Sequence, residues 1–140
     1  MLTTKLKRVG PMAFSASTGS GHTVVMDASP EVGGENKGPR PMEMLLMGLG
    51  GCSCIDVVMI LEKARQDVKN CRVEISAERA ETEPKVFTDI QVHFIVEGHH
   101  LSTKRVEKAI ALSAEKYCSA SIMLGKTAKI THDFEIIESE

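Results

Sequence analysis

Hydrophobic and polar residues alternate with a period of two in three stretches of the second half of the chain, at residues 73–78, 90–97 and 128–136. Such alternation is typical of strands that have one face on a core and one face toward solvent. Residues 81–85, which include Pro84, join the first two stretches as a hairpin. Glycine-rich turn signals near the N-terminus bracket two further short strands, Met12–Ala16 and His22–Met26.

A long helix is predicted from Pro41 to about Gln66. Proline suits the first helical position, and the charge of Glu43 in the first turn suits the helix dipole. From Met44 to Leu61 the apolar residues lie on nearly all sides, which marks a helix that is buried in a core or an interface. A second helix is predicted to begin after Ser102, a good N-cap residue, and to carry Cys118 near its end.

The order of strands, helix, strands, helix and strand predicts an α+β fold. Residues 29–39, rich in glycine and proline, form the one linker-like stretch, so residues 1–140 are expected to form a single domain. Glycines at positions 48, 50 and 51 each cost a helix about 1 kcal/mol relative to alanine, and close approach of another backbone is the usual reason for them. A chain this short has little remaining surface to cover such a helix, which favours a homodimer.

The charges are nearly balanced, with 17 basic and 19 acidic residues and a formal net charge of -2. This balance argues against a nucleic acid or an anionic membrane as a partner. The N-terminus lacks the apolar run of a secretory signal. The longest uncharged stretch, Met44–Ile55, is shorter than the roughly 20 residues that a bilayer requires. We therefore expect a cytoplasmic protein with no nucleic-acid or membrane partner.

Four cysteines, Cys52, Cys54, Cys71 and Cys118, are the candidate reactive groups. In a reducing compartment they are expected to be thiols rather than structural disulfides. Cys54 lies about 200° around the helix from Cys52 and is interpreted as core packing. Cys71, placed in the turn before the first hairpin strand, is interpreted in the same way. No pair of cysteines or histidines has the spacing of a zinc site, so no metal and no other cofactor is expected.

Two motifs resemble those of the OsmC/Ohr family. Residues 38–52, Gly-Pro-Arg-Pro-Met-Glu-Met-Leu-Leu-Met-Gly-Leu-Gly-Gly-Cys, match a motif in which a proline and a glutamate open an apolar helix that leads to a cysteine. Residues 114–118, Ala-Glu-Lys-Tyr-Cys, match a second cysteine near the end of a later helix. Gly50-Gly51-Cys52 followed by Ile55-Asp56-Val57-Val58 is similar to the YhfA-like branch. The resemblance extends along essentially the whole chain.

The resemblance implies an intertwined homodimer in which two central helices pack on antiparallel β-sheets, with active sites at the subunit boundary. It also implies a cofactor-independent thiol peroxidase that acts on organic hydroperoxides. By the same resemblance, Cys52 is the attacking cysteine and Cys118 its disulfide partner. A dithiol reductant, lipoyl-like in some relatives, is expected to restore both thiols.

An attacking cysteine must be ionised, and a thiol with a pKa near 8.5 is mostly protonated at about neutral pH. In similar enzymes an arginine held by the glutamate of the helix motif stabilises the thiolate. Glu43 matches that glutamate, and Arg40 is assigned as the arginine in preference to Arg8. Nine residues separate Glu43 from Cys52, which places them on opposite faces of a regular helix. Glu43 is therefore expected to serve Cys52 of the other subunit.

A different class of function stays open, because one fold can host several functions. The alternative is a non-catalytic redox-sensing thiol protein or a module that binds a small hydrophobic ligand. Consumption of an alkyl hydroperoxide by the protein separates these interpretations.

Overall fold

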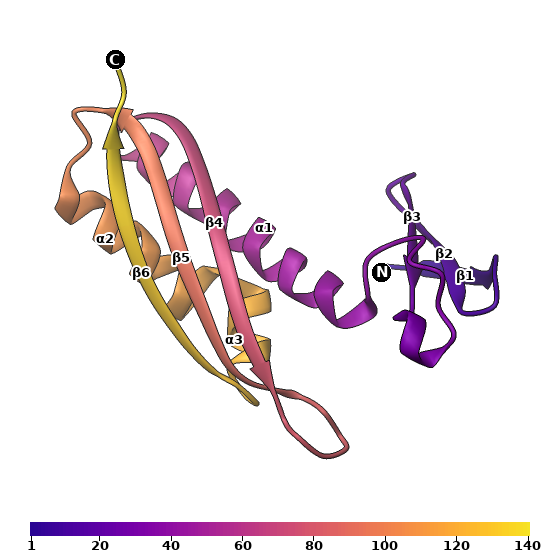
Figure 1. Ribbon diagram of the computed structural model, residues 1–140. Helices are drawn as coiled ribbons and strands as arrows, with labels where there is room; N and C mark the ends of the chain where they lie inside the picture. Colours follow the sequence, from indigo (N-terminus) through magenta and orange to yellow (C-terminus); the bar gives the residue numbers. More distant parts are fainter. The chain divides into compact units, whose positions relative to one another are not determined.

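The alternating stretches of the sequence fold into two three-stranded sheets (Figure 1). The computed structural model describes residues 1–140, and these form two compact units, residues 1–47 and residues 48–140. The first sheet holds β1 (Thr4–Arg8), β2 (Ala13–Thr18) and β3 (Thr23–Asp27). The second sheet holds β4 (Asp67–Arg79), β5 (Phe87–His99) and β6 (Lys129–Glu138). The α+β class predicted from the sequence is confirmed.

The N-terminal sheet is antiparallel throughout, with β2 in the centre. β2 and β3 coincide closely with the two predicted strands, whereas β1 was not indicated by any apolar alternation. The loop after β3 contains a 3-10 turn, η1 (Pro30–Val32), and folds back tightly on the strand. A Cβ atom at Gly34 would lie 1.7 Å from the carbonyl oxygen of Ala28, so this close approach requires glycine.

The long helix α1 spans Pro41–Lys63, close to the predicted range. At its start, the Glu43 carboxylate accepts a hydrogen bond of 2.7 Å from the Arg40 backbone N–H, which satisfies a donor at the helix N-terminus. Past its end, Arg65 adopts a left-handed conformation with φ of 62°, and the chain turns into β4.

By length and composition alone α1 could cross a bilayer, because a helix of 23 residues continues past the short uncharged stretch. A core helix of a soluble protein passes the same test. Leu49, Val57 and Leu61 of α1 are fully buried within the C-terminal unit. The helix also carries Asp56, which accepts a hydrogen bond from Ser113. These contacts place one side of α1 in the core of the C-terminal unit, although only 28% of its most apolar window is buried in this chain.

The C-terminal sheet combines an antiparallel and a parallel pair. β4 and β5 form the predicted hairpin, whereas β6 pairs with β5 in parallel. The expectation of antiparallel sheets is therefore corrected for this pair. The physical reason is the crossover from β5 to β6 through three helical segments. It returns the chain to the end of the sheet where β5 begins, so β6 runs in the same direction as β5. They are α2 (Thr103–Leu112), the π-turn η2 (Ser113–Tyr117) and α3 (Ser119–Leu124).

The core of the C-terminal unit lies between the sheet and its helices, which cover one face of the sheet in Figure 1. Val92, Phe94 and Val96 of β5 are all 1% exposed or less, and Val106 of α2 is fully buried. Ser102 caps α2 as predicted, since its hydroxyl accepts a hydrogen bond from the Arg105 N–H.

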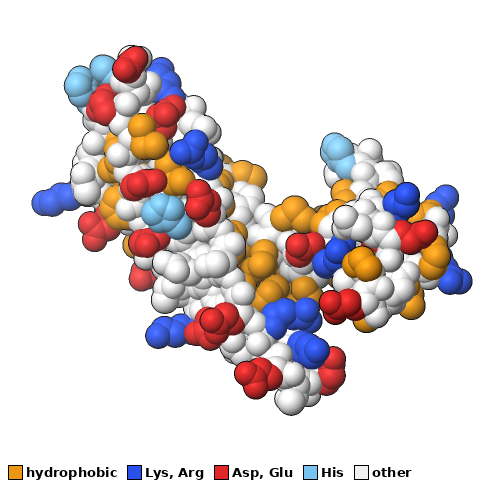
Figure 2. Space-filling model, in the orientation of Figure 1, with side chains coloured by type: hydrophobic (Ala, Val, Ile, Leu, Met, Phe, Trp, Pro, Cys, Tyr) orange, Lys and Arg blue, Asp and Glu red, His pale blue; other side chains and the backbone are white.

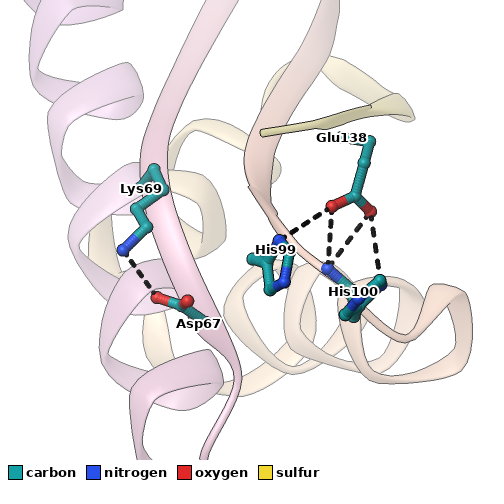
Figure 3. A network of polar contacts seen from close by, with 5 residues as sticks. All are labelled: Asp67, Lys69, His99, His100 and Glu138. Atoms are coloured by element: carbon teal, nitrogen blue, oxygen red, sulfur yellow. Dashed lines mark hydrogen bonds and ion pairs between the residues drawn. The ribbon is translucent and has the colours of Figure 1, made fainter. Parts of the chain in front are cut away.

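Polar side chains cover the outer surface of this unit, and Figure 2 shows acidic and basic groups interspersed there. At one end of the sheet, Glu138 of β6 accepts two hydrogen bonds of 3.1 Å from the His100 N–H (Figure 3). Its carboxylate also lies 3.3 Å from Nδ1 of His99. The same end holds an ion pair between Lys69 and Asp67. These contacts stabilise the ends of the strands.

Candidate functional site

Two of the predicted site residues, Cys52 and Cys118, come together in the C-terminal unit. Their sulfur atoms and a carboxylate oxygen of Asp56 all lie within 4.8 Å of one another. Cys118 is completely buried, whereas Cys52 and Asp56 are half-buried. The cluster therefore offers two sulfurs and one carboxylate, with Cys52 the more accessible sulfur.

Cys52 and Asp56 share one side of α1 because they are four residues apart, or about one helical turn. Cys118 arrives from the break between the π-turn η2 and α3, where its backbone is extended with φ of -78° and ψ of 100°. There its sulfur caps α3 by accepting a hydrogen bond of 3.3 Å from the Ser121 N–H. With this irregular backbone, the Cys118 sulfur lies next to the side chains of α1.

Two buried serines complete the site, each 1% exposed. The Ser113 hydroxyl donates a hydrogen bond of 3.0 Å to Oδ2 of Asp56. The Ser53 hydroxyl lies 3.6 Å from the Cys118 sulfur. Asp56 and the Cys118 sulfur therefore each have a buried hydroxyl as a polar neighbour.

Burial raises the pKa of the Cys118 thiol, and the neighbouring Cys52 raises it further by hydrogen bonding and by charge. The hydrogen bonds from Ser53 and Ser121 act in the opposite direction but do not offset these effects. Cys118 therefore holds its proton more tightly than an ordinary thiol does.

Glu43 and Arg40 belong to the other compact unit, where they hold the loop that leads into α1. Besides the bond between the Arg40 N–H and Glu43, the Arg40 guanidinium donates to the Asn36 side chain at 2.9 Å and to the Gly38 carbonyl at 3.1 Å. Its charge also acts on Asp27, which is buried. Burial raises the pKa of Asp27, but three backbone N–H donors and Arg40 hold it below its ordinary value. The roles of Glu43 and Arg40 at Cys52 stay predictions.

The remaining two cysteines form a second pair. Cys71 lies within β4, opposite Val96 of β5, and not in the turn expected from the sequence. Its thiol lies close enough to that of Cys54 for each group to shift the pKa of the other. The interaction with Cys71 lowers the pKa of Cys54 more than burial raises it, whereas the interaction with Cys54 and burial both raise the pKa of Cys71. The interpretation of both as packing residues stays a prediction, and the structure adds that a strand and a helix bring the two together.

No pattern in the sequence predicted a role for Asp56, Ser53 or Ser113. The four-residue spacing of Cys52 and Asp56 was the available signal, since it places both side chains on one helical face. The serines carried no signal, because their partners are more than 50 residues away in the chain.

Comparison with known proteins gives matches along nearly the whole chain. The family described as "OsmC-like protein" matches residues 34–133. Protein YhfA of Escherichia coli (strain K12) is 47% identical over 133 residues, which are 95% of this chain and 96% of that protein.

Solved structures give the same match at lower identity. A hypothetical protein from Aquifex aeolicus VF5 is 29% identical, with a TM-score of 0.89 over 100% of this chain and 98% of the other. An organic hydroperoxide resistance protein, OsmC, from Legionella pneumophila has a TM-score of 0.73 over 96% of each chain, at 17% identity. At this identity, the structure from Legionella pneumophila shows a likeness of fold alone.

Proposed function

The chain belongs to the OsmC-like family, and from this premise we propose that it reduces organic hydroperoxides, with Cys52 as the attacking thiolate and Cys118 as its disulfide partner. The observation that carries the proposal is the proximity of the two sulfurs, within 4.8 Å, at a site where one is half-buried and the other fully buried. Relatives of the same fold include the hydroperoxide resistance protein from Legionella pneumophila.

The proposed reaction has two steps at sulfur. The Cys52 thiolate attacks one peroxide oxygen, the O–O bond breaks, and the sulfur becomes a sulfenic acid while the leaving alkoxide takes a proton to form the alcohol. The Cys118 thiol then displaces the sulfenic hydroxyl as water and forms a disulfide. The sulfurs lose two electrons and the peroxide gains them.

The asymmetry of the pair supports this division of roles. Cys52 is the sulfur that a peroxide can reach, and Cys118 is shielded from it. The two sulfurs must approach from their present separation to the disulfide length of about 2.05 Å. The break in the backbone at Cys118 is the natural place for this movement, because no regular helix has to be disrupted. A dithiol, lipoyl-type in the proposal, then reduces the disulfide by exchange and is itself oxidised.

A homodimer is part of the proposal. The side of α1 that carries Gly51, Ile55 and Met59 is apolar and open: Ile55 is 62% exposed and Met59 is 50% exposed. A Cβ atom added at Gly51 would meet nothing within 4 Å. A second chain on this side would remove the apolar surface from water. An activating role of Arg40 and Glu43 depends on this dimer, since both would act on Cys52 of the other subunit.

A cytoplasmic location is also proposed, since all four cysteines are free thiols.

The test is consumption of cumene hydroperoxide with dihydrolipoamide as reductant. We expect turnover by the wild type and by the matched controls Cys54→Ser and Cys71→Ser. Cys52→Ser is expected to fall to the rate of free thiols in solution. Cys118→Ser should turn over more slowly and accumulate Cys52 as sulfenic or more highly oxidised acid, which mass spectrometry detects. A wild type no faster than Cys52→Ser would reject the peroxidase and favour the non-catalytic alternative.

A further inference from the structure

The cluster of Cys52, Asp56 and Cys118 has the composition of a metal site that the spacing of the sequence does not reveal. We propose that the reduced cluster binds one Zn²⁺ ion through its two thiolates and its carboxylate, and that the bound ion regulates the site by blocking attack on peroxide. The regulatory part rests on the proposed peroxidase function. The binding part stands on the geometry alone.

The donor set matches zinc. Zn²⁺ accepts thiolate and carboxylate ligands in a tetrahedral arrangement, and three protein ligands leave one position open. All three donor atoms lie within 4.8 Å of one another, so small side-chain movements can bring them onto one ion. Mg²⁺ and Ca²⁺ prefer sites made of oxygen ligands, so two sulfurs out of three donors select against them.

The atoms around the cluster are arranged as outer-shell partners of a metal site usually are. Ser113 donates to one oxygen of Asp56 and leaves the other available. Ser121 donates its N–H to the Cys118 sulfur, and the Ser53 hydroxyl lies beside the same sulfur. Such donors orient metal ligands and lower the cost of ordering them on binding.

Charge balance also favours a cation. With both thiols ionised, the cluster carries three negative charges in a partly buried place. Asp56 forms no ion pair with lysine, arginine or histidine, since the ion pairs of the chain lie elsewhere, as in Asp67–Lys69 and His93–Asp133. A divalent ion compensates these charges in part.

Metal binding and peroxide reduction compete for the same electrons on sulfur. A thiolate that donates its lone pair to Zn²⁺ is less available to attack an O–O bond. Conversely, formation of the disulfide removes two of the three ligands, so oxidation by the hydroperoxide would release the ion.

The experiment titrates the reduced full-length protein with ZnCl₂ against a chromophoric chelator, and with Co²⁺ to detect thiolate charge-transfer absorption. We expect one ion per chain in the wild type and in Cys54→Ser and Cys71→Ser. Cys52→Ser and Cys118→Ser should lose the Co²⁺ band and bind zinc at least about tenfold more weakly, with a similar loss for Asp56→Asn. Ser113→Ala tests the same carboxylate without removing it. Equal affinity in wild type and Cys118→Ser, or an equal loss in Cys54→Ser, would overturn the proposal.

Zinc added to the peroxidase assay separates this proposal from the proposed function. Inhibition of the wild type, relieved by a chelator and weaker in Ser113→Ala, supports regulation. Zinc binding by a protein that consumes no hydroperoxide leaves the site valid and rejects the peroxidase. Turnover that is unaffected by zinc at saturation would reject the regulation.

Discussion

Cys52 and Cys54 are two residues apart on one helix, yet they enter different chemical surroundings. Cys52 faces a polar cluster with Asp56, Cys118 and two buried serines. Cys54 faces Cys71 on β4. The direction of this second contact follows from Gly50, whose added Cβ would touch Val73 and Ile75. Cys54 lies one turn after Gly50 on α1. Cys71 lies two residues before Val73, on the same face of β4.

Exposure does not distinguish these thiols. Cys52, Cys54 and Cys71 are all half-buried. What differs is the neighbouring group that can move a proton or bind an ion. The first pair has a carboxylate within 4.8 Å, and the second pair has only the other thiol as a polar partner. Chemistry that needs proton transfer is therefore expected at the first pair.

The largest expected difference between the pairs is in the disulfide that forms. One equivalent of cumene hydroperoxide should link Cys52 to Cys118 nearly completely and leave Cys54 and Cys71 as thiols, because the alkoxide leaving group needs a proton donor nearby. Peptide mapping after alkylation at low pH measures both. Cys54→Ser should form the same link as the wild type. Equal linkage of Cys54 to Cys71 would show that the polar neighbours of Cys52 do not direct the reaction.

A smaller difference is expected in alkylation of the reduced, folded protein. The pKa of Cys54 is lowered by Cys71, and the pKa of Cys118 is raised by burial and by Cys52. Since thiolates react with iodoacetamide and thiols do not, Cys54 should react at least about tenfold faster than Cys118 near pH 8. Mass spectrometry of time points gives both rates, and the urea-unfolded chain is the control. Equal rates in the folded protein would contradict the assigned environments.

The raised pKa of Cys118 also makes the stability of the fold depend on pH. Because the pKa of Cys118 is raised in the folded state, the folded chain holds this proton more tightly than the unfolded chain does. Its contribution to stability is therefore complete below the unfolded thiol pKa and is lost as pH rises through the folded pKa. Urea unfolding at increasing alkaline pH should show this loss in the wild type and less of it in Cys118→Ala.

The parts of the fold that depend on local pattern were predictable from the sequence. Pro41, Glu43 and Ser102 act at helix ends as predicted, and the hairpin of β4 and β5 follows the alternation of its residues. β1 escaped prediction because Leu6 alone is apolar among its five residues. The parallel pairing of β6 escaped it because strand direction is set by the crossover rather than by the strand's own residues.

The site was predictable only in part, for the same reason. The resemblance pointed to Cys52 and Cys118, but Asp56 gained its meaning from a sulfur 62 residues later in the chain. The π-turn that aims Cys118 has no pattern in sequence that distinguishes it from an α-helix. The pairing of Cys54 with Cys71 likewise required the register of α1 on β4, which Gly50 sets by contact and not by pattern.

The smallest expected effect concerns Gly50, which is on the buried side of α1, and Gly51, which is on the exposed side. Alanine in place of either glycine should gain up to about 1 kcal/mol of helix propensity. At Gly50 the added Cβ would lie 3.1 Å from Ile75 and 3.2 Å from Val73, so these side chains must shift and part of the gain is lost. At Gly51 it would meet nothing within 4 Å of this chain. Urea unfolding of Gly51→Ala and Gly50→Ala at low protein concentration should rank Gly51→Ala as the more stable.

Sedimentation of the same variants tests the dimer proposal. A second chain packed on Gly51 would make Gly51→Ala, and not Gly50→Ala, dissociate at higher concentration than the wild type. The reverse ranking in both measurements would mean that the open side of α1 lies at Gly50, and the register that brings Cys54 to Cys71 would fail with it.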